Sequence, residues 1–293
     1  MICHTIKEIL NHAAEAYGGE DAVRYKAGKH EIASKSYAQL LEDSERISGV
    51  LKELGPQGMH VALTGMTSYL WIASYFGIVG SGDVAVPLDV SLPAAELCEL
   101  IDRSDAEVFL YDELRRDAAE LAREKCPKLR YILPMQPGAG SLPEAMESAR
   151  RYSVQADPDA LCTIMFTSGT TGKSKGVMLT QRNLAENATC LDMKLPSRAV
   201  TLSVLPIHHA YCLGMDILKA LSLGTVICIN AGGQEYQAVP TGYDADGADD
   251  DRDDGQEAER RGESARRSGA QRSVRGKSAY NLQRRRILKS RMD

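Results

Sequence analysis

The sequence predicts an α/β fold of parallel sheets flanked by helices, followed by a disordered C-terminal tail. Three observations carry this prediction. Helical and strand-like hydrophobic patterns alternate up to about residue 230, as expected when parallel strands are joined by helices. A glycine-rich run directly follows the apolar segment 161–166. Beyond residue 231 the hydrophobic pattern is lost. We therefore divide the chain into a folded part, 1–231, and a tail, 232–293.

Helix boundaries are clearest in the first hundred residues. Ser36 is a suitable N-cap for the second predicted helix, and Gly55 followed by Pro56 is a suitable stop. The apolar helix that contains Trp71 is too short to span a bilayer, so we expect it in the core. The sequence predicts helices over 5–17, 37–54, 69–80, 93–103, 113–125 and 215–222.

Short apolar segments between these helices predict the strands. They occupy 61–64, 84–88, 107–111, 130–133, 161–166, 177–179, 201–205 and 225–229. The carboxyl ends of parallel strands carry the loops that bind ligands in such folds. The glycine-rich run follows one of these strands, so its position fits a ligand site.

The run itself reads Phe166-Thr-Ser-Gly-Thr-Thr-Gly-Lys-Ser-Lys-Gly. Glycines let successive amides converge on an anion, while hydroxyls and lysines add donors and positive charge. We expect it to hold nucleotide phosphates. A Walker loop would need glycine at the position of Thr167, which excludes that motif. The alternative, a flexible linker, fits poorly because apolar segments bracket the run on both sides.

The same run resembles the phosphate loop of AMP-forming adenylating enzymes, the family of acyl-CoA synthetases, luciferases and peptide-synthetase adenylation domains. Ser174 stands where that family usually has proline. Two further segments are similar to family elements: Lys35 to Leu40, and Gly80 to Asp89. The resemblance covers roughly residues 1–230 and implies a partial N-terminal domain of an AMP-dependent synthetase.

The resemblance also implies site residues. The segment Leu205-Pro-Ile-His-His is similar to a family element whose histidine lies between the acyl pocket and the phosphates, and His209 falls on that position. We expect His209 to be catalytic, because a histidine there can donate to an oxyanion or a phosphate. A histidine that only satisfies the core or surface is the alternative. Lys175 is expected to support the loop, and the Thr167 hydroxyl to reach Mg²⁺. The residues expected to bind the nucleotide are Thr167, Ser168, Gly169, Thr170, Thr171, Gly172, Lys173 and Lys175.

These implied roles define an expected reaction. The enzymes of this family join a carboxylic acid to ATP to form an acyl-adenylate, and usually transfer it to coenzyme A. We therefore expect ATP, Mg²⁺ and coenzyme A as co-substrates and cofactor, and a small carboxylic acid, with preference for a fatty acid, as substrate. The sequence contains no Tyr-Gly-x-Thr-Glu segment and no later lid with a catalytic lysine. We therefore expect little activity from this chain.

Composition excludes several other classes. A net charge of −5 gives no general attraction to nucleic acid or to anionic membranes. The seven cysteines have no Cys-x-x-Cys spacing and lie mostly in apolar segments, which favours reduced thiols in a cytoplasmic protein. No segment has the length of a transmembrane helix.

The tail is rich in charge, as in Asp249 to Asp254 and Arg284 to Arg286. Such a segment buries too little apolar surface to offset its ordering entropy. When it is back-translated and read one nucleotide out of frame, however, it permits two hydrophobically patterned runs that resemble long-chain fatty acyl-CoA synthetases. We therefore hypothesise a frameshift near codon 230. The alternatives are an inactive remnant and a binding module with a charged interaction tail.

Overall fold

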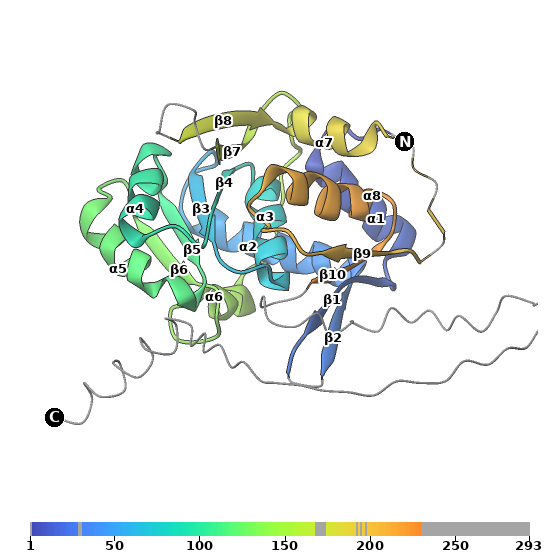
Figure 1. Ribbon diagram of the computed structural model, residues 1–293, viewed down its shortest axis with the longest axis horizontal. Coiled ribbons are helices and arrows are strands. Elements are labelled where there is room, and N and C mark those ends of the chain that lie inside the picture. Colours follow the sequence, from blue (N-terminus) through green and yellow to red (C-terminus); the bar gives the residue numbers. More distant parts are fainter. Residues whose placement is uncertain are drawn as a thin grey trace, which may run out of the picture. The chain divides into compact units, whose positions relative to one another are not determined.

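A computed structural model describes residues 2–28, 31–167, 174–191, 193, 195–196 and 198–229. It confirms the predicted α/β fold. The strands form two sheets, and most neighbouring strands in them are parallel. Helices pack against these sheets (Figure 1). The predicted tail, 232–293, lies outside the described residues.

The smaller sheet has four strands in the order β2-β1-β10-β9. Strands β1, β10 and β9 are parallel, and β2 is antiparallel to β1. One edge of this sheet is therefore β9, whose Leu202 side chain is exposed. The strands are β1 (Asp21–Lys26), β2 (Ile32–Ser36), β9 (Val200–Ser203) and β10 (Val226–Ile229).

The larger sheet has six strands in the order β6-β5-β3-β4-β7-β8. All neighbours are parallel except β7 and β8, which form an antiparallel pair at the edge. This order places the carboxyl ends of β4 and β7 side by side. The strands are β3 (His60–Thr64), β4 (Val84–Leu88), β5 (Val108–Tyr111), β6 (Tyr131–Pro134), β7 (Leu161–Thr167) and β8 (Lys175–Thr180).

The six predicted helices are all present, whereas α6 and α7 were not predicted. The second helix begins after Ser36, whose hydroxyl accepts the Gln39 amide in a capping box, and it ends at Gly55. The helices are α1 (Ile6–Tyr17), α2 (Tyr37–Leu54), α3 (Tyr69–Ser81), α4 (Ala94–Arg103), η1 (Glu113–Arg115), α5 (Arg116–Lys125), α6 (Leu142–Ser148), α7 (Gln181–Thr189), η2 (Cys212–Lys219) and α8 (Ala220–Ser222). Among the described residues no helix is long and apolar enough to cross a membrane.

Alternation along the strands gives the larger sheet a core on each face. Ala62 belongs to a cluster with Leu97 and Ala118 of α4 and α5, whereas its neighbours Val61 and Leu63 join the cluster that contains α2 and α3. The sheet therefore lies between two helical layers, with α4 and α5 on one side (Figure 1). Trp71 of α3 is fully buried and stacks on Tyr75, as expected for the apolar helix.

Glycines allow close approach of backbone to backbone around α2. An added Cβ on Gly49 would lie 1.9 Å from the carbonyl oxygen of Arg150, in the segment that leads from α6 towards β7. The same segment is held by Tyr152, whose amide donates to the Glu45 carbonyl at 3.0 Å. The absence of a side chain at Gly49 therefore allows the segment before β7 to lie directly against α2.

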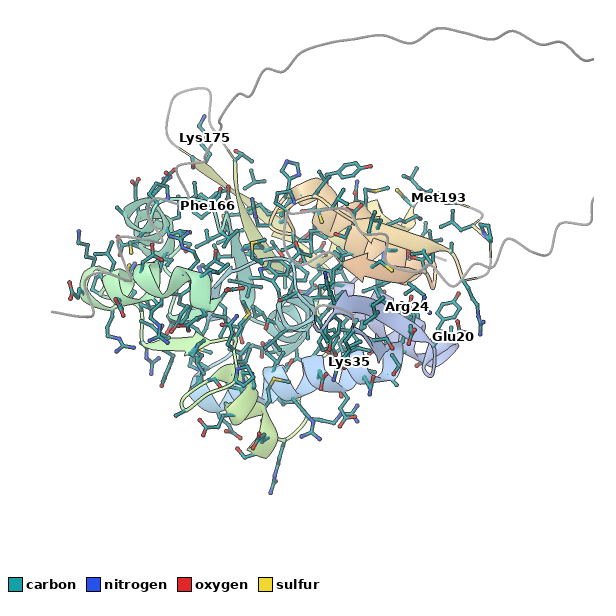
Figure 2. All side chains as sticks on the ribbon, turned by 60° about the horizontal axis from the view of Figure 1, so that its bottom comes forward. Glu20, Arg24, Lys35, Phe166, Lys175 and Met193 are labelled. Atoms are coloured by element: carbon teal, nitrogen blue, oxygen red, sulfur yellow. The ribbon has the colours of Figure 1, made fainter. Side chains whose placement is uncertain are left out.

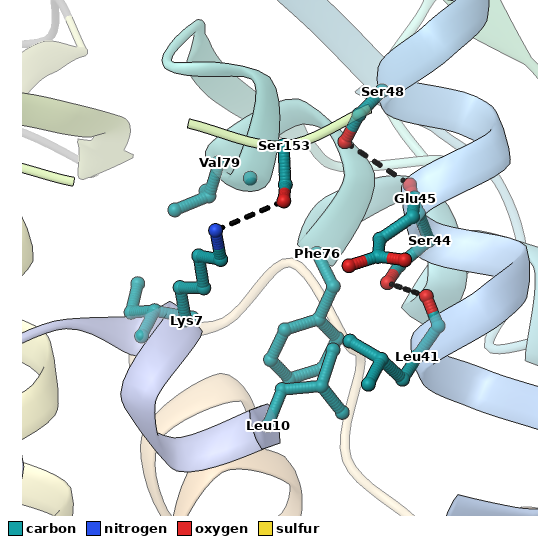
Figure 3. A pocket seen from close by; sticks show the side chains of 11 residues that line it. Lys7, Leu10, Leu41, Ser44, Glu45, Ser48, Phe76, Val79 and Ser153 are labelled. Atoms are coloured by element: carbon teal, nitrogen blue, oxygen red, sulfur yellow. Dashed lines mark hydrogen bonds between the residues drawn. The ribbon is translucent and has the colours of Figure 1, made fainter. Parts of the chain in front are cut away.

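A small cavity of about 20 Å³ lies among α1, α2 and α3 (Figure 3). Lys7 crosses it and donates to the Ser153 hydroxyl at 2.9 Å and to the Val154 carbonyl at 2.7 Å. A space of this size holds no more than about one water molecule. The cavity is therefore a packing feature of the helical layer.

Asp83 before β4 is buried and orders the turn that precedes β3. Its Oδ1 accepts the amides of Gly58 and Met59 at 2.9 Å each, and its Oδ2 accepts the Ser81 hydroxyl at 2.6 Å. We predict that Asp83→Ala lowers the free energy of unfolding by about 2–4 kcal/mol, because the buried Met59 amide and Ser81 hydroxyl lose their carboxylate acceptor. Urea denaturation measures this. Asp83→Asn keeps one acceptor oxygen, so its free energy of unfolding should decrease much less. An equal decrease for both variants would contradict the explanation.

Candidate functional site

A cavity of about 380 Å³ opens at the adjacent carboxyl ends of β4 and β7. Its walls come from the loop after β4, the start of α4, the end of β7 and the segment that follows β9. The lining residues are Pro87, Leu88, Asp89, Leu92, Glu96, Leu100, Met165, Phe166, Thr167, Ser174, His208, His209 and Ala210. Both sheets therefore contribute to one cavity.

The β7–β8 pair presents the two ends of the glycine-rich run to this cavity. Phe166 lies opposite Gly176, and Thr167 opposite Lys175. The Thr167 hydroxyl donates to the Lys175 carbonyl at 3.5 Å, a long contact that leaves it accessible. The side chains of Phe166 and Lys175 are seen at these strand ends in Figure 2. Lys175 is exposed and does not line the cavity.

The remaining predicted nucleotide-binding residues lie outside the described residues: Ser168, Gly169, Thr170, Thr171, Gly172 and Lys173. The structure places the flanks of the run, Thr167 and Ser174, in the cavity wall. The roles of all these residues remain predictions.

His209 lies in the same cavity wall as Thr167. Its ring is exposed, and its Nδ1 accepts the Tyr211 amide at 3.3 Å. Because Nδ1 is an acceptor, a neutral ring carries its proton on Nε2. His209 can therefore donate from Nε2 to a bound anion.

His208 also lines the cavity and is less exposed than His209. Its Nε2 is 3.6 Å from Oδ2 of Asp89. Burial lowers the pKa of His208 below its ordinary value, and His209 lowers it further, although Asp89 opposes this. Burial also works against ionisation of Asp89, but the Ser91 amide and hydroxyl, with His208 and Arg115, lower the pKa of its carboxyl overall.

These shifts predict a pH dependence of stability. Above the ordinary histidine pKa of 6.5, His208 is neutral in both folded and unfolded chains. As the pH falls below 6.5, the unfolded chain takes up the proton first, so the free energy of unfolding decreases. Urea denaturation at about pH 7.5 and about pH 5.5 should show a smaller decrease for His208→Asn than for the unchanged chain. An identical decrease would show that His208 does not contribute.

The side chains of the cavity include both groups that favour and groups that oppose binding of a nucleotide. His208, His209 and the hydroxyls of Thr167 and Ser174 are suitable donors, whereas Asp89 and Glu96 repel a phosphate. A divalent cation would relieve that repulsion. The described residues contain no group of three or more His, Cys, Asp or Glu side chains arranged to hold a metal ion.

Comparison with known proteins agrees with this geometry. Residues 10–241 match the model of the AMP-binding enzyme family. The chain belongs to this family. The match covers the β7–β8 pair and both histidines, and it extends past the predicted boundary at residue 231.

Curated relatives are CoA ligases of several kinds. The chain is 27% identical over 219 residues to a long-chain-fatty-acid–CoA ligase of Thermus thermophilus, covering 70% of this chain and 40% of that protein. It is 29% identical over 240 residues to the 4-coumarate–CoA ligase-like 9 of Oryza sativa, covering 77% of this chain and 42% of that protein. This chain thus spans less than half the length of these relatives.

Solved structures share the fold. The inhibitor-bound N-terminal domain of FACL13 from Mycobacterium tuberculosis superposes with a TM-score of 0.71 at 25% identity, covering 80% of this chain and 58% of that one. Apo MatB from Rhodopseudomonas palustris superposes with a TM-score of 0.67 at 27% identity, covering 78% of this chain and 45% of that one. The described part of this chain therefore has the architecture of such N-terminal domains.

Three titratable lining residues were not predicted as site residues from the sequence: His208, Asp89 and Glu96. For Asp89 a signal was present, because a carboxylate directly after a parallel strand lies at the ligand-binding edge of the sheet. His208 gave none, since adjacent histidines do not reveal which ring faces a cavity.

Proposed function

We propose that this chain carries the ATP-binding part of an AMP-forming acid–thiol ligase. In this reaction the carboxylate of a small acid attacks the α-phosphate of ATP and pyrophosphate leaves. The thiol of coenzyme A then attacks the acyl carbon of the acyl-adenylate, a thioester forms and AMP leaves. The observation that supports the proposal is one cavity that holds both Thr167 and His209, from different sheets. Family membership supports the same assignment.

The main difficulty of such a reaction is that acid and nucleotide are both anions, so positioning and electrostatics dominate. Residues 167–173 would surround the β- and γ-phosphates, with Lys175 as support. Bound Mg²⁺ would supply positive charge, with the Thr167 hydroxyl as its contact in this chain. His209 would donate from Nε2 to the acid or the phosphate, and the apolar wall of Leu92, Leu100 and Met165 would exclude water.

A fatty acid is the substrate we propose, because the Thermus relative is named a long-chain-fatty-acid ligase and the shifted-frame runs of the tail resemble such enzymes. Other relatives are named for coumarate and for crotonobetaine or carnitine. A fatty-acid panel that includes these acids separates the possibilities.

We further propose that the chain in its present form makes little acyl-adenylate, with residues 1–231 as the adenylation part and 232–293 as an out-of-frame tail. Contacts to adenine and ribose contribute about 1–3 kcal/mol each to ATP binding. The sequence lacks segments that resemble those which make these contacts in the family. ATP–pyrophosphate exchange with the acid panel tests this. Clear turnover would overturn the inactivity, and no detectable MgATP binding would overturn the nucleotide site.

An inactive remnant is the second candidate. Among the described residues β9 is an edge strand, and Leu202 and nearby Val204 are about half exposed. This favours the remnant, because an apolar strand edge promotes association. Limited proteolysis and light scattering distinguish it: a remnant would aggregate and yield few protected fragments.

A further inference from the structure

Arg103, the last residue of α4, contacts the chain on both sides of the glycine-rich run. Its Nη2 donates to the Ser174 carbonyl at 2.7 Å. Its Cζ lies 5.6 Å from the centroid of the Phe166 ring, at cation–π distance. Phe166 begins the run and Ser174 follows Lys173 within it, so one guanidinium contacts the run on both sides of residues 167–173.

The Phe166 ring is held by its own strand pair. Phe166 lies opposite Gly176 in the β7–β8 register. A Cβ added to Gly176 would lie 3.5 Å from Cε1 of Phe166 and 3.1 Å from Cγ2 of Ile164. The ring thus covers the glycine at contact distance, and it offers Arg103 a fixed surface.

Glu99 orients the guanidinium from one turn earlier in α4, where its Oε1 is 3.5 Å from Nη1 of Arg103. The pair is exposed, so it stabilises the fold little. Arg103 thus contacts three groups of this chain: the Glu99 carboxylate, the Ser174 carbonyl and the Phe166 ring. This arrangement suits a role in positioning better than direct capture of a ligand.

We propose that Arg103 is a positioning residue for nucleotide binding. It fixes the ends of β7 and β8, at 166–167 and 174–175, so that Thr167 and Ser174 are already held in the cavity wall before a nucleotide binds. This inference rests on the proposed nucleotide site.

The test compares three variants: Arg103→Ala, Arg103→Lys and Arg130→Ala. Arg130 is the matched control, because it also stacks on an aromatic ring, that of Tyr131 at 5.3 Å, and pairs with Glu107 at 3.3 Å, but it lies on the opposite edge of the sheet. Arg103→Ala should weaken MgATP binding, measured by titration calorimetry, about fivefold to tenfold. Arg103→Lys should lose less of the affinity for MgATP, and Arg130→Ala should leave that affinity unchanged.

Amide hydrogen exchange without nucleotide provides the second measurement. Arg103→Ala should speed exchange at 175–176 by a similar factor, and Arg130→Ala should not. Weakened MgATP binding with unchanged exchange would mean that Arg103 contacts the nucleotide directly, and this result would overturn the positioning role. Unchanged MgATP binding would also overturn it. If the unchanged chain binds no MgATP, the proposed nucleotide site fails, while exchange at 175–176 still decides whether Arg103 fixes the strand ends. If Arg103→Ala does not fold, Arg103→Lys is judged by the same measurements.

Discussion

Gly49→Ala is expected to lower the free energy of unfolding by about 3 kcal/mol or more. The added Cβ would lie 1.9 Å from the Arg150 carbonyl oxygen, far inside contact distance. Because that oxygen belongs to the backbone, relief requires α2 and the segment after α6 to separate. The same segment is tied to α2 by the Arg151–Glu45 ion pair at 2.6 Å, so the shift would disturb further contacts.

Urea denaturation measures the loss, and Gly214→Ala is the control. Gly214 lies in η2, and a Cβ there meets no heavy atom within 4 Å. Alanine should be neutral at that position or stabilise by up to about 1 kcal/mol, because it favours helical conformations. Equal destabilisation by both substitutions would show that the approach to Arg150 is not the cause.

The second large effect concerns the reading frame. If the proposed frameshift is real, a single-nucleotide correction near codon 230 should raise ATP–pyrophosphate exchange about a thousandfold. Restoring two or three adenine and ribose contacts of about 1–3 kcal/mol each accounts for that factor. The measurement compares original and corrected genes with the same panel of fatty acids.

Two controls make this result interpretable. His209→Ala in the corrected protein should remove much of the gain, because that ring is the proposed donor to the reacting anions. Independent sequencing of the gene should show the corrected frame. An unbroken frame in independent reads and in relatives, or a corrected protein without exchange, would contradict the hypothesis.

Local signals explain which elements the sequence could predict. Ser36 and Gly55 bound α2 because capping and helix termination depend on residues close in the chain. The β1–β2 pair was missed: β2 reads Ile-Ala-Ser-Lys-Ser and lies at an edge, so it lacks a buried face that would impose alternation. Helix α7 was also missed, although Thr180 and Asn183 form a capping box that was visible in the sequence.

The site was predictable only in part for a related reason. The run after Phe166 and the position of His209 can be read from short motifs. The contact of Arg103 with Ser174 joins residues that are distant in sequence, and the distance between them depends on how α4 packs on the sheet. No local pattern encodes such a contact, just as none encodes the approach of His208 to Asp89.

The cavity wall draws Thr167 from the larger sheet and His209 from the segment after β9 of the smaller one. A molecule that touches both residues would act as a bridge between two separately hydrogen-bonded layers. By mass action, saturation with such a molecule must raise the temperature at which the layers come apart. Thermal shift thus offers a screen for the proposed acid substrate that needs no turnover.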